Sequence, residues 1–149
     1  MLTGCKGAFE TNPKAEEQIL QYVQDTFAGK LNGKKLTNNT SLHQEAAQIL
    51  AKVTEDGRIK ESDYRRGKLT IYDGLYKAEV KIACVVLPDE PSEDGMLQMQ
   101  EFTGNISGFL KELLDDLNRQ CDMLLDFGVA TRVINGKTYV AIAYVAYKS

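Results

Sequence analysis

The sequence predicts a single α+β domain, arranged as an α-β-α sandwich in which helices flank both faces of a central antiparallel sheet. Three observations predict this fold. Apolar residues recur every three or four positions in two early segments and one late segment, which is typical of amphipathic helices. Asn135-Gly136 joins two strands through a tight hairpin. The last strand, residues 139–147, is apolar or aromatic at every position, so both of its faces must be covered.

Composition supports one globular domain and excludes one class of partner. The chain has 149 residues, 43% of them hydrophobic, and a domain of this size buries about 68–70% of its unfolded surface. Its 18 Lys and Arg and 21 Asp and Glu residues give a net charge of −3, and the basic residues are scattered. Nucleic-acid binding requires a basic patch or stripe, so we expect no nucleic-acid partner. No segment is apolar for long enough to span a bilayer.

Two helices are predicted early in the domain. Asn12 and Pro13 begin the first, because Asn caps helices and Pro is accepted at the first helical position. Gly29 favours its end, and Ser41 with Gln44 has the spacing of a capping box that begins the second helix. The apolar face of the first helix is Ile19, Leu20, Val23 and Phe27. That of the second is Leu42, Ala46, Ile49, Leu50 and Val53, before Asp56-Gly57 ends it.

The middle of the chain changes to strand periodicity. We expect a short helix over residues 59–64, a brief strand at Leu69 and Ile71, and a turn at Asp73-Gly74. A long strand follows, and an acidic loop from Pro88 to Gly95 comes after it. One face of the long strand is Tyr76, Ala78, Val80, Ile82, Cys84 and Val86.

The last third predicts a helix and the closing hairpin. The helical pattern is strongest here, and its apolar residues are Ile106, Phe109, Leu110, Leu113, Leu114 and Leu117. Residues 127–134 and 139–147 are the two strands of the hairpin, since Asn-Gly readily takes the positive φ angles of a type I′ turn.

The first residues predict a lipid anchor. Leu2-Thr3-Gly4-Cys5 has the form of a bacterial lipobox, in which small residues allow cleavage before a cysteine that carries lipid. Residues 1–12 are therefore assigned to a lipobox remnant and flexible polar tether, and residues 13–149 to the folded domain. Two acyl chains on Cys5 would hold the domain stably on a membrane. Only Met1 precedes Leu2, so export requires an upstream signal peptide; otherwise the match is accidental and the protein is cytosolic.

Two further cysteines remain once Cys5 is assigned to lipid. Cys84 falls in the long strand and Cys121 follows the late helix, and this spacing fits no metal-binding pattern. We expect two buried free thiols, with a Cys84–Cys121 disulfide as the alternative in an oxidising compartment.

The order of these elements resembles the CAP superfamily of cysteine-rich secretory, antigen 5 and pathogenesis-related proteins. Leu36 to Leu42 is similar to the leucine-led stretch that precedes a run of alanines in that family. Arg58-Ile59-Lys60 and Asp63-Tyr64 stand where bacterial members tend to have Arg-Ile and Gly-Tyr. Phe127 to Ala130 and Asn135 to Tyr139 resemble the family's Ile-Gly-Val-Gly strand and its Gly-x-x-Tyr return. The resemblance extends from about Pro13 to Tyr147 and implies the same sandwich fold.

The sequence departs from the family at its cleft. Many members carry two histidines and two glutamates that can hold a divalent metal, whereas His43 is the only histidine of this chain and lies ahead of the first cleft position. Leu69-Thr70-Ile71 stands where the family has Glu-Asn-Ile. One imidazole cannot rebuild a two-histidine site, so we predict no metal site, no cofactor and no catalytic residue.

Other catalytic and binding signals are weak. His43 lacks an identified nucleophile and, at a helix start, is expected to face solvent. Asp115 and Asp116 are adjacent on a helix and point in different directions, so they form no acid/base pair. The acidic loop residues Asp89, Glu90, Glu93 and Asp94 lack the spacing of a calcium loop and are expected to be solvated. The tyrosines near the sheet, expected in its core and edges, are Tyr64, Tyr72, Tyr76, Tyr139, Tyr144 and Tyr147.

The sequence therefore favours a non-catalytic, extracytoplasmic binding domain of a bacterial lipoprotein, anchored by Cys5. Such a domain would recognise an envelope component, a lipid or a host molecule; its ligand-binding residues and oligomeric state are not predicted. One alternative is a hydrolase with an unorthodox site built on His43 and a nearby carboxylate. A second alternative is a cytosolic α+β domain unrelated to the CAP superfamily.

Overall fold

The computed structural model describes residues 9–66, 71–73, 76–82 and 95–147, and the side chains of residues 9–63 and 95–147. The fold is α+β, as predicted. In chain order the elements are α1 (Pro13–Thr26), the 3₁₀ helix η1 (Ala28–Lys30), α2 (Thr40–Leu50), β1 (Arg58–Lys60), α3 (Glu61–Arg66), β2 (Ile71–Asp73), β3 (Tyr76–Ile82), β4 (Met96–Gln98), α4 (Gly108–Gln120), β5 (Met123–Ile134) and β6 (Lys137–Tyr147). None of the described helices is both long and apolar enough to cross a bilayer.

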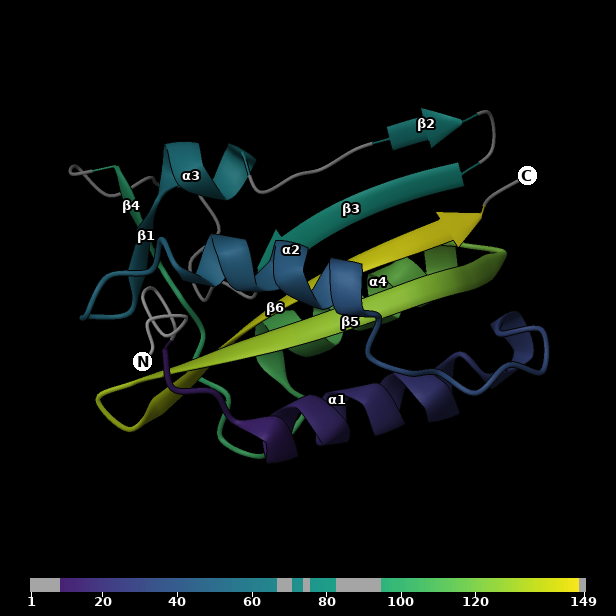
Figure 1. Cartoon of the computed structure of the whole chain (residues 1–149), viewed down its shortest axis with the longest axis horizontal. Helices are drawn as coiled ribbons and strands as arrows, with labels where there is room; N and C mark the ends of the chain where they lie inside the picture. Colours follow the sequence, from purple (N-terminus) through teal and green to yellow (C-terminus); the bar gives the residue numbers. More distant parts are fainter. Residues whose placement is uncertain (1–8, 67–70, 74–75, 83–94, 148–149) are drawn as a thin grey trace.

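A four-stranded antiparallel sheet forms the centre of the molecule, in the order β2-β3-β6-β5 (Figure 1). The hairpin of β5 and β6 pairs from Met123↔Tyr147 to Ile134↔Lys137, with a bulge between Leu124 and Asp126. Asn135 and Gly136 have φ angles of 51° and 78°, as the predicted type I′ turn requires. A separate two-stranded sheet pairs β1 with β4.

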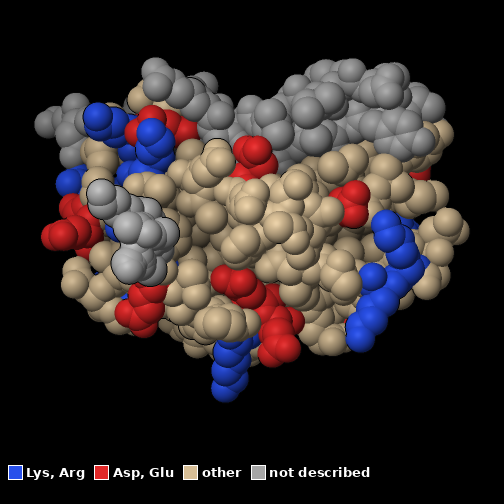
Figure 2. All heavy atoms as spheres, in the orientation of Figure 1, with Lys and Arg blue, Asp and Glu red and all other residues tan. Residues whose placement is uncertain are grey.

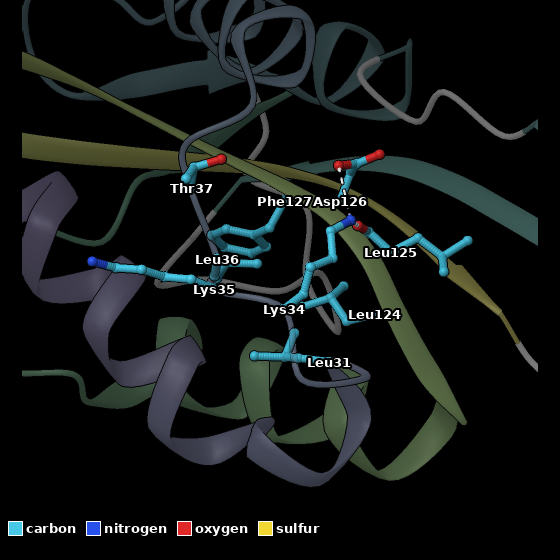
Figure 3. Close-up of a pocket in the computed structure, with 9 residues that line it drawn as sticks. All are labelled: Leu31, Lys34, Lys35, Leu36, Thr37, Leu124, Leu125, Asp126 and Phe127. Atoms are coloured by element: carbon cyan, nitrogen blue, oxygen red, sulfur yellow. Dashed lines mark hydrogen bonds and ion pairs between the residues drawn. The ribbon is translucent and has the colours of Figure 1, made fainter.

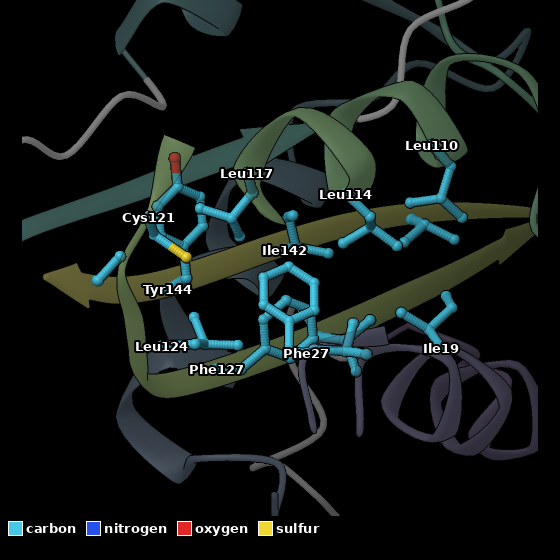
Figure 4. Close-up of a cluster of buried hydrophobic side chains, with 14 of the residues drawn as sticks. Ile19, Phe27, Leu110, Leu114, Leu117, Cys121, Leu124, Phe127, Ile142 and Tyr144 are labelled. Carbon is cyan, nitrogen blue, oxygen red and sulfur yellow. The ribbon is translucent and has the colours of Figure 1, made fainter. Parts of the chain in front are cut away.

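The last strand is buried on both faces, as predicted, and its side chains alternate between two apolar cores. The α1/α4 core contains Val140, Ile142, Tyr144 and Ala146 of β6, packed with α1, α4 and one face of β5 (Figure 4). The α2 core contains Tyr139, Ala141 and Ala143, packed with α2, β1 and β4. In Figure 1, α2 crosses the viewer's side of the β5–β6 hairpin and α4 lies behind it.

The helix faces were predicted correctly, but one helix start was not. Asn12 caps α1, because its Oδ1 accepts a hydrogen bond of 3.1 Å from the backbone N–H of Ala15. The cap of α2 is Asn39, whose Oδ1 accepts from Leu42 N at 3.0 Å, so the predicted capping box at Ser41 and Gln44 is wrong. The amide of Asn39 satisfies the first turn, and Ser41 therefore lies inside the helix.

Several strand assignments also differ from the prediction: β4 was not predicted, and β6 begins at Lys137 rather than at residue 139. Residues 58–60 form β1 and only then does α3 begin, at Glu61, because β1 pairs with β4, a strand that follows a long stretch of intervening chain. Strand β5 begins at Met123 rather than 127, since it continues through the bulge. Asp73 of β2 pairs with Tyr76 of β3, whereas Gly74 of the predicted Asp73-Gly74 turn lies outside the described residues.

Several predicted positions lie outside the described residues. They are Cys5, Leu69, Thr70, Gly74, Cys84, Val86 and the acidic loop residues Asp89, Glu90, Glu93 and Asp94. Tyr64, Tyr72 and Tyr76 belong to described elements, but their side chains are not described.

Gly128 determines how closely α2 approaches the sheet. A Cβ atom at this position would lie 2.4 Å from the His43 backbone nitrogen and 2.6 Å from the Leu42 carbonyl carbon. Only glycine permits the first turn of α2 to contact β5 so closely. This contact brings His43 and the preceding asparagines to the outer edge of β5.

Candidate functional site

A small hollow lies beside the bulge of β5, under the loop that follows η1 (Figure 3). Its lining residues are Leu31, Lys34, Lys35, Leu36, Thr37, Leu124, Leu125, Asp126 and Phe127. Its volume of about 20 Å³ is enough for about one water molecule. Lys34 Nζ donates to the Leu125 carbonyl oxygen at 2.8 Å and lies 4.0 Å from Asp126 Oδ1. A drug-sized ligand needs a far larger cavity, so this hollow is no small-molecule site in the described conformation.

A polar cluster lies at the outer edge of β5. This edge cluster consists of Glu16 from α1, Asn38 before α2, His43 from α2 and Thr131 from β5. Of these four residues, only His43 was predicted as a candidate, because the four come from separate segments. The sequence feature that could have pointed to Asn38 is the pair Asn38-Asn39, which stands just before a predicted helix.

The imidazole of His43 binds the backbone of β5. Its Nδ1 lies 2.7 Å from the Val129 carbonyl oxygen, a group that only accepts hydrogen bonds. We therefore assign the proton of the neutral ring to Nδ1, which leaves the lone pair on Nε2. The prediction that His43 faces solvent is correct only in part: its side chain is 35% exposed, but one ring nitrogen is held by the sheet.

Glu16 connects the cluster to the buried side of β5. Its Oε2 accepts hydrogen bonds from the Thr131 hydroxyl at 2.7 Å and from the Thr131 backbone N–H at 3.2 Å. Its Oε1 lies 4.0 Å from His43 Nδ1, and the carboxylate side chain is 14% exposed. Thr131 itself is fully buried, so its hydroxyl is not available to attack a substrate.

The edge cluster completes the hydrogen bonding of an outer strand. Asn38 Nδ2 donates to the Val129 carbonyl oxygen at 2.9 Å, and Asn38 Oδ1 accepts from Val129 N at 2.9 Å, as a neighbouring strand would. Further along β5, Asn39 N donates to the Phe127 carbonyl oxygen and Val133 N donates to the Glu10 carbonyl oxygen. Exposed strand edges pair readily with other chains, and these contacts close the β5 edge to such pairing.

A second polar group joins α1 to α4. Tyr22 Oη donates to Asp115 Oδ1 at 2.7 Å, and Lys111 Nζ donates to Asp115 Oδ2 at 2.5 Å. The hydrogen bonds from Lys111 and then from Tyr22 lower the pKa of Asp115. Burial first, and then the bond to Asp115, raises the pKa of Tyr22. Asp116 instead accepts from Arg119 and Gln120, so the two aspartates point apart as predicted.

Two of the predicted sheet tyrosines and Cys121 are core residues. Tyr139 and Tyr144 are each 3% exposed, which confirms their predicted place in the sheet core. Cys121 is a buried free thiol, as predicted, and burial raises its pKa. Across the described side chains, no three His, Cys, Asp or Glu residues gather in an arrangement that could hold a metal ion.

Arg132 connects the end of α2 to the chain that precedes α1. Its Nη1 donates to the carbonyl oxygens of Leu50 and Val53, each at 2.9 Å, which satisfies acceptors at the end of α2. The guanidinium lies 4.9 Å from the ring centroid of Phe9, within the range of a cation–π contact. Neither contact has a local sequence signal, because each joins segments that are far apart in the chain.

Comparisons with family models, curated proteins and solved structures each found no significant match for this chain.

Proposed function

We propose that this chain is a CAP-like binding domain without catalytic activity, held by lipid on Cys5 at the extracytoplasmic side of a bacterial membrane. There it recognises an envelope component, a lipid or a host molecule. Its helices and sheet form an α-β-α sandwich in this proposal. The alternation of β6 side chains between the α1/α4 core and the α2 core supports that arrangement.

The observation that carries the non-catalytic assignment is the way the edge cluster uses its groups. His43 Nδ1 binds the Val129 carbonyl oxygen, and Glu16 Oε2 accepts two hydrogen bonds from Thr131. A nucleophile must reach the substrate, whereas the Thr131 hydroxyl is fully buried. Glu16, Asn38 and His43, the three residues of the cluster that lie outside β5, each therefore have a structural partner on β5.

The competing hydrolase hypothesis has one observation in its favour. Glu16 Oε1 lies 4.0 Å from His43 Nδ1, and the ring orientation leaves Nε2 as the basic nitrogen. A base oriented by a carbonyl or carboxylate is a common catalytic arrangement. In this version, His43 Nε2 would activate a water molecule at the surface.

Hydrolysis assays on a matched pair of His43 variants separate the two hypotheses. In His43→Asn, the amide nitrogen can still donate to the Val129 carbonyl oxygen, but the base is lost; in His43→Ala both are lost. We expect no turnover of ester, peptide or glycoside substrates above the buffer rate in the wild type or in either variant. Turnover by the wild type that disappears in a folded His43→Asn variant would refute the non-catalytic assignment.

A further inference from the structure

The residues just before α1 are fixed to the domain and form a strap, Phe9 to Asn12. Glu10 accepts from Val133 N at 2.8 Å through its carbonyl oxygen. Asn12 N donates to Thr131 Oγ1 at 2.7 Å, and Asn12 Nδ2 donates to Thr138 Oγ1 at 3.0 Å. Together with the packing of Phe9 against the Arg132 guanidinium, these contacts hold the strap. The described part of the predicted tether is thus bound to β5 and β6.

The strap lies at one end of the sheet. It contacts the last residues of β5, beside the hairpin turn at Asn135 and the turn that follows α2, where Asn135 Nδ2 donates to the Glu55 carbonyl oxygen at 3.2 Å. We name this the anchor end. The loop of residues 31–37 and the bulge of β5 lie at the opposite, distal end (Figure 1). Leu124 and Ile134 are ten residues apart along β5, which corresponds to about 33 Å.

The covalent distance from Cys5 to the strap is short. Four residue steps separate Cys5 from Phe9, and a fully extended chain covers at most about 14 Å in four steps. A lipid on Cys5 therefore keeps Phe9 within about 14 Å of the anchored cysteine, less than half the distance between the two ends of β5.

We propose that the domain sits on a phospholipid surface by its anchor end and presents the distal end to solution. This orientation rests on the proposed lipidation of Cys5. Charge does not supply the orientation, because exposed residues of both signs lie at the anchor end: Glu10 of the strap and Glu55 beside Asn135 are acidic, and Lys137 after the hairpin turn is basic. Figure 2 shows basic and acidic side chains together at this end of the molecule. The short tether and the bound strap are sufficient to keep the anchor end against the membrane. The loop of residues 31–37 then faces away from the membrane, where a partner in solution can reach it.

Energy transfer from a single tryptophan tests this orientation, because the chain has no tryptophan of its own. Lys137→Trp places the reporter at the anchor end and Lys35→Trp at the distal end; both positions are exposed lysines, so the charge change is matched. Each full-length, lipidated variant is incorporated into phosphatidylcholine vesicles that contain dansyl-labelled lipid. We expect energy transfer to be several-fold stronger from position 137 than from position 35. Equal transfer, or stronger transfer from position 35, would overturn the orientation.

Two controls distinguish failure of the orientation from failure of the anchor. Vesicle flotation of the wild type, compared with Cys5→Ser, reports whether lipid on Cys5 attaches the protein to the membrane. Wild-type protein that carries no lipid and fails to float overturns both the anchor and the orientation. Protein that floats but shows equal transfer overturns the orientation alone. Inserting a flexible 20-residue Gly-Ser linker after Lys6 adds a reach of about 25 Å. We expect the ratio of the two transfer efficiencies to fall toward one in that variant.

Discussion

At the residue scale, Gly128 and Asn38 place α2 and close the β5 edge. Gly128 allows the backbone of His43 to approach the strand, and Asn38 then pairs with both polar backbone groups of Val129. Both effects depend on single residues whose neighbours in space come from distant parts of the sequence.

Substitution of Gly128 by alanine should destabilise the domain strongly. The added Cβ meets backbone atoms at 2.4 and 2.6 Å, and backbone cannot move aside as a flexible side chain does. We expect a loss of about 3 kcal/mol in the free energy of unfolding, at the upper end of overpacking effects. Gly29→Ala is the matched control, because a methyl group added at Gly29 would meet no atom within 4 Å. Equal denaturant midpoints for the two variants would contradict the close approach.

Removal of the Asn38 amide should leave the backbone N–H of Val129 without a partner. We expect Asn38→Ala to lower the free energy of unfolding by about 1–3 kcal/mol, since the buried Val129 N–H becomes unsatisfied. The Val129 carbonyl oxygen loses the Asn38 bond but keeps the bond from His43 Nδ1. Asn105→Ala, at an exposed position, is the control and should change stability by less than about 0.5 kcal/mol. Urea unfolding measures both values. Size-exclusion chromatography of Asn38→Ala reports whether the opened edge also pairs with a second copy.

At the element scale, local sequence signals predicted most elements, and long-range contacts explain where they failed. Helical periodicity located the faces of α1, α2 and α4, and Asn135-Gly136 located the hairpin, because these signals lie within one segment. Strand β1 escaped prediction because its three residues form a strand only by pairing with β4. The edge cluster escaped for the same reason, since Glu16, Asn38 and Thr131 meet only in the folded chain.

Helix α4 should depend on a cap supplied from outside the helix. Ser107 occupies the N-cap position without a side-chain bond, whereas Gln100 Oε1 accepts from Leu110 N at 3.1 Å and Gln100 Nε2 donates to the Ser107 carbonyl oxygen at 2.8 Å. We expect Gln100→Ala to lower the free energy of unfolding by about 1 kcal/mol. Ser107→Ala, which keeps the backbone acceptor, should cost less than about 0.5 kcal/mol. A larger cost for Ser107→Ala would exclude this capping scheme.

The contact between α1 and α4 should make stability depend on pH at both extremes. The pKa of Asp115 is lowered from 3.8, so its contribution is complete above that value and disappears as pH falls through the folded pKa. The pKa values of Tyr22 and Lys111 are raised from 10.0 and 10.5, so their contributions are complete below those values and disappear as pH rises. We expect the stability difference between wild type and Asp115→Asn to be largest at intermediate pH. A difference that is constant from acid to alkaline pH would contradict the role of ionised Asp115.

At the scale of the whole molecule, β6 is buried on both faces, side-chain and backbone contacts close the β5 edge, and the N-terminal strap is bound to β5 and β6. The prediction that the last strand is covered on both faces is confirmed by its burial. Function could be predicted only as far as the residues allowed: Cys5 and the resemblance to the CAP superfamily suggested an anchored binding domain, and the edge cluster supports a non-catalytic assignment. The described residues do not identify which ligand the domain binds.

The most direct test of the proposed anchored domain is the mass of the N-terminal peptide, isolated from the membrane fraction of the producing bacterium. We predict a peptide that begins at Cys5 and carries a diacylglyceryl group on the Cys5 sulfur. Its amino terminus is either free or acylated. Cys5→Ser should yield no lipid-bearing peptide and release the protein from the membrane fraction. An unmodified Cys5 preceded by Leu2-Thr3-Gly4 in the wild-type protein would contradict the proposed anchoring.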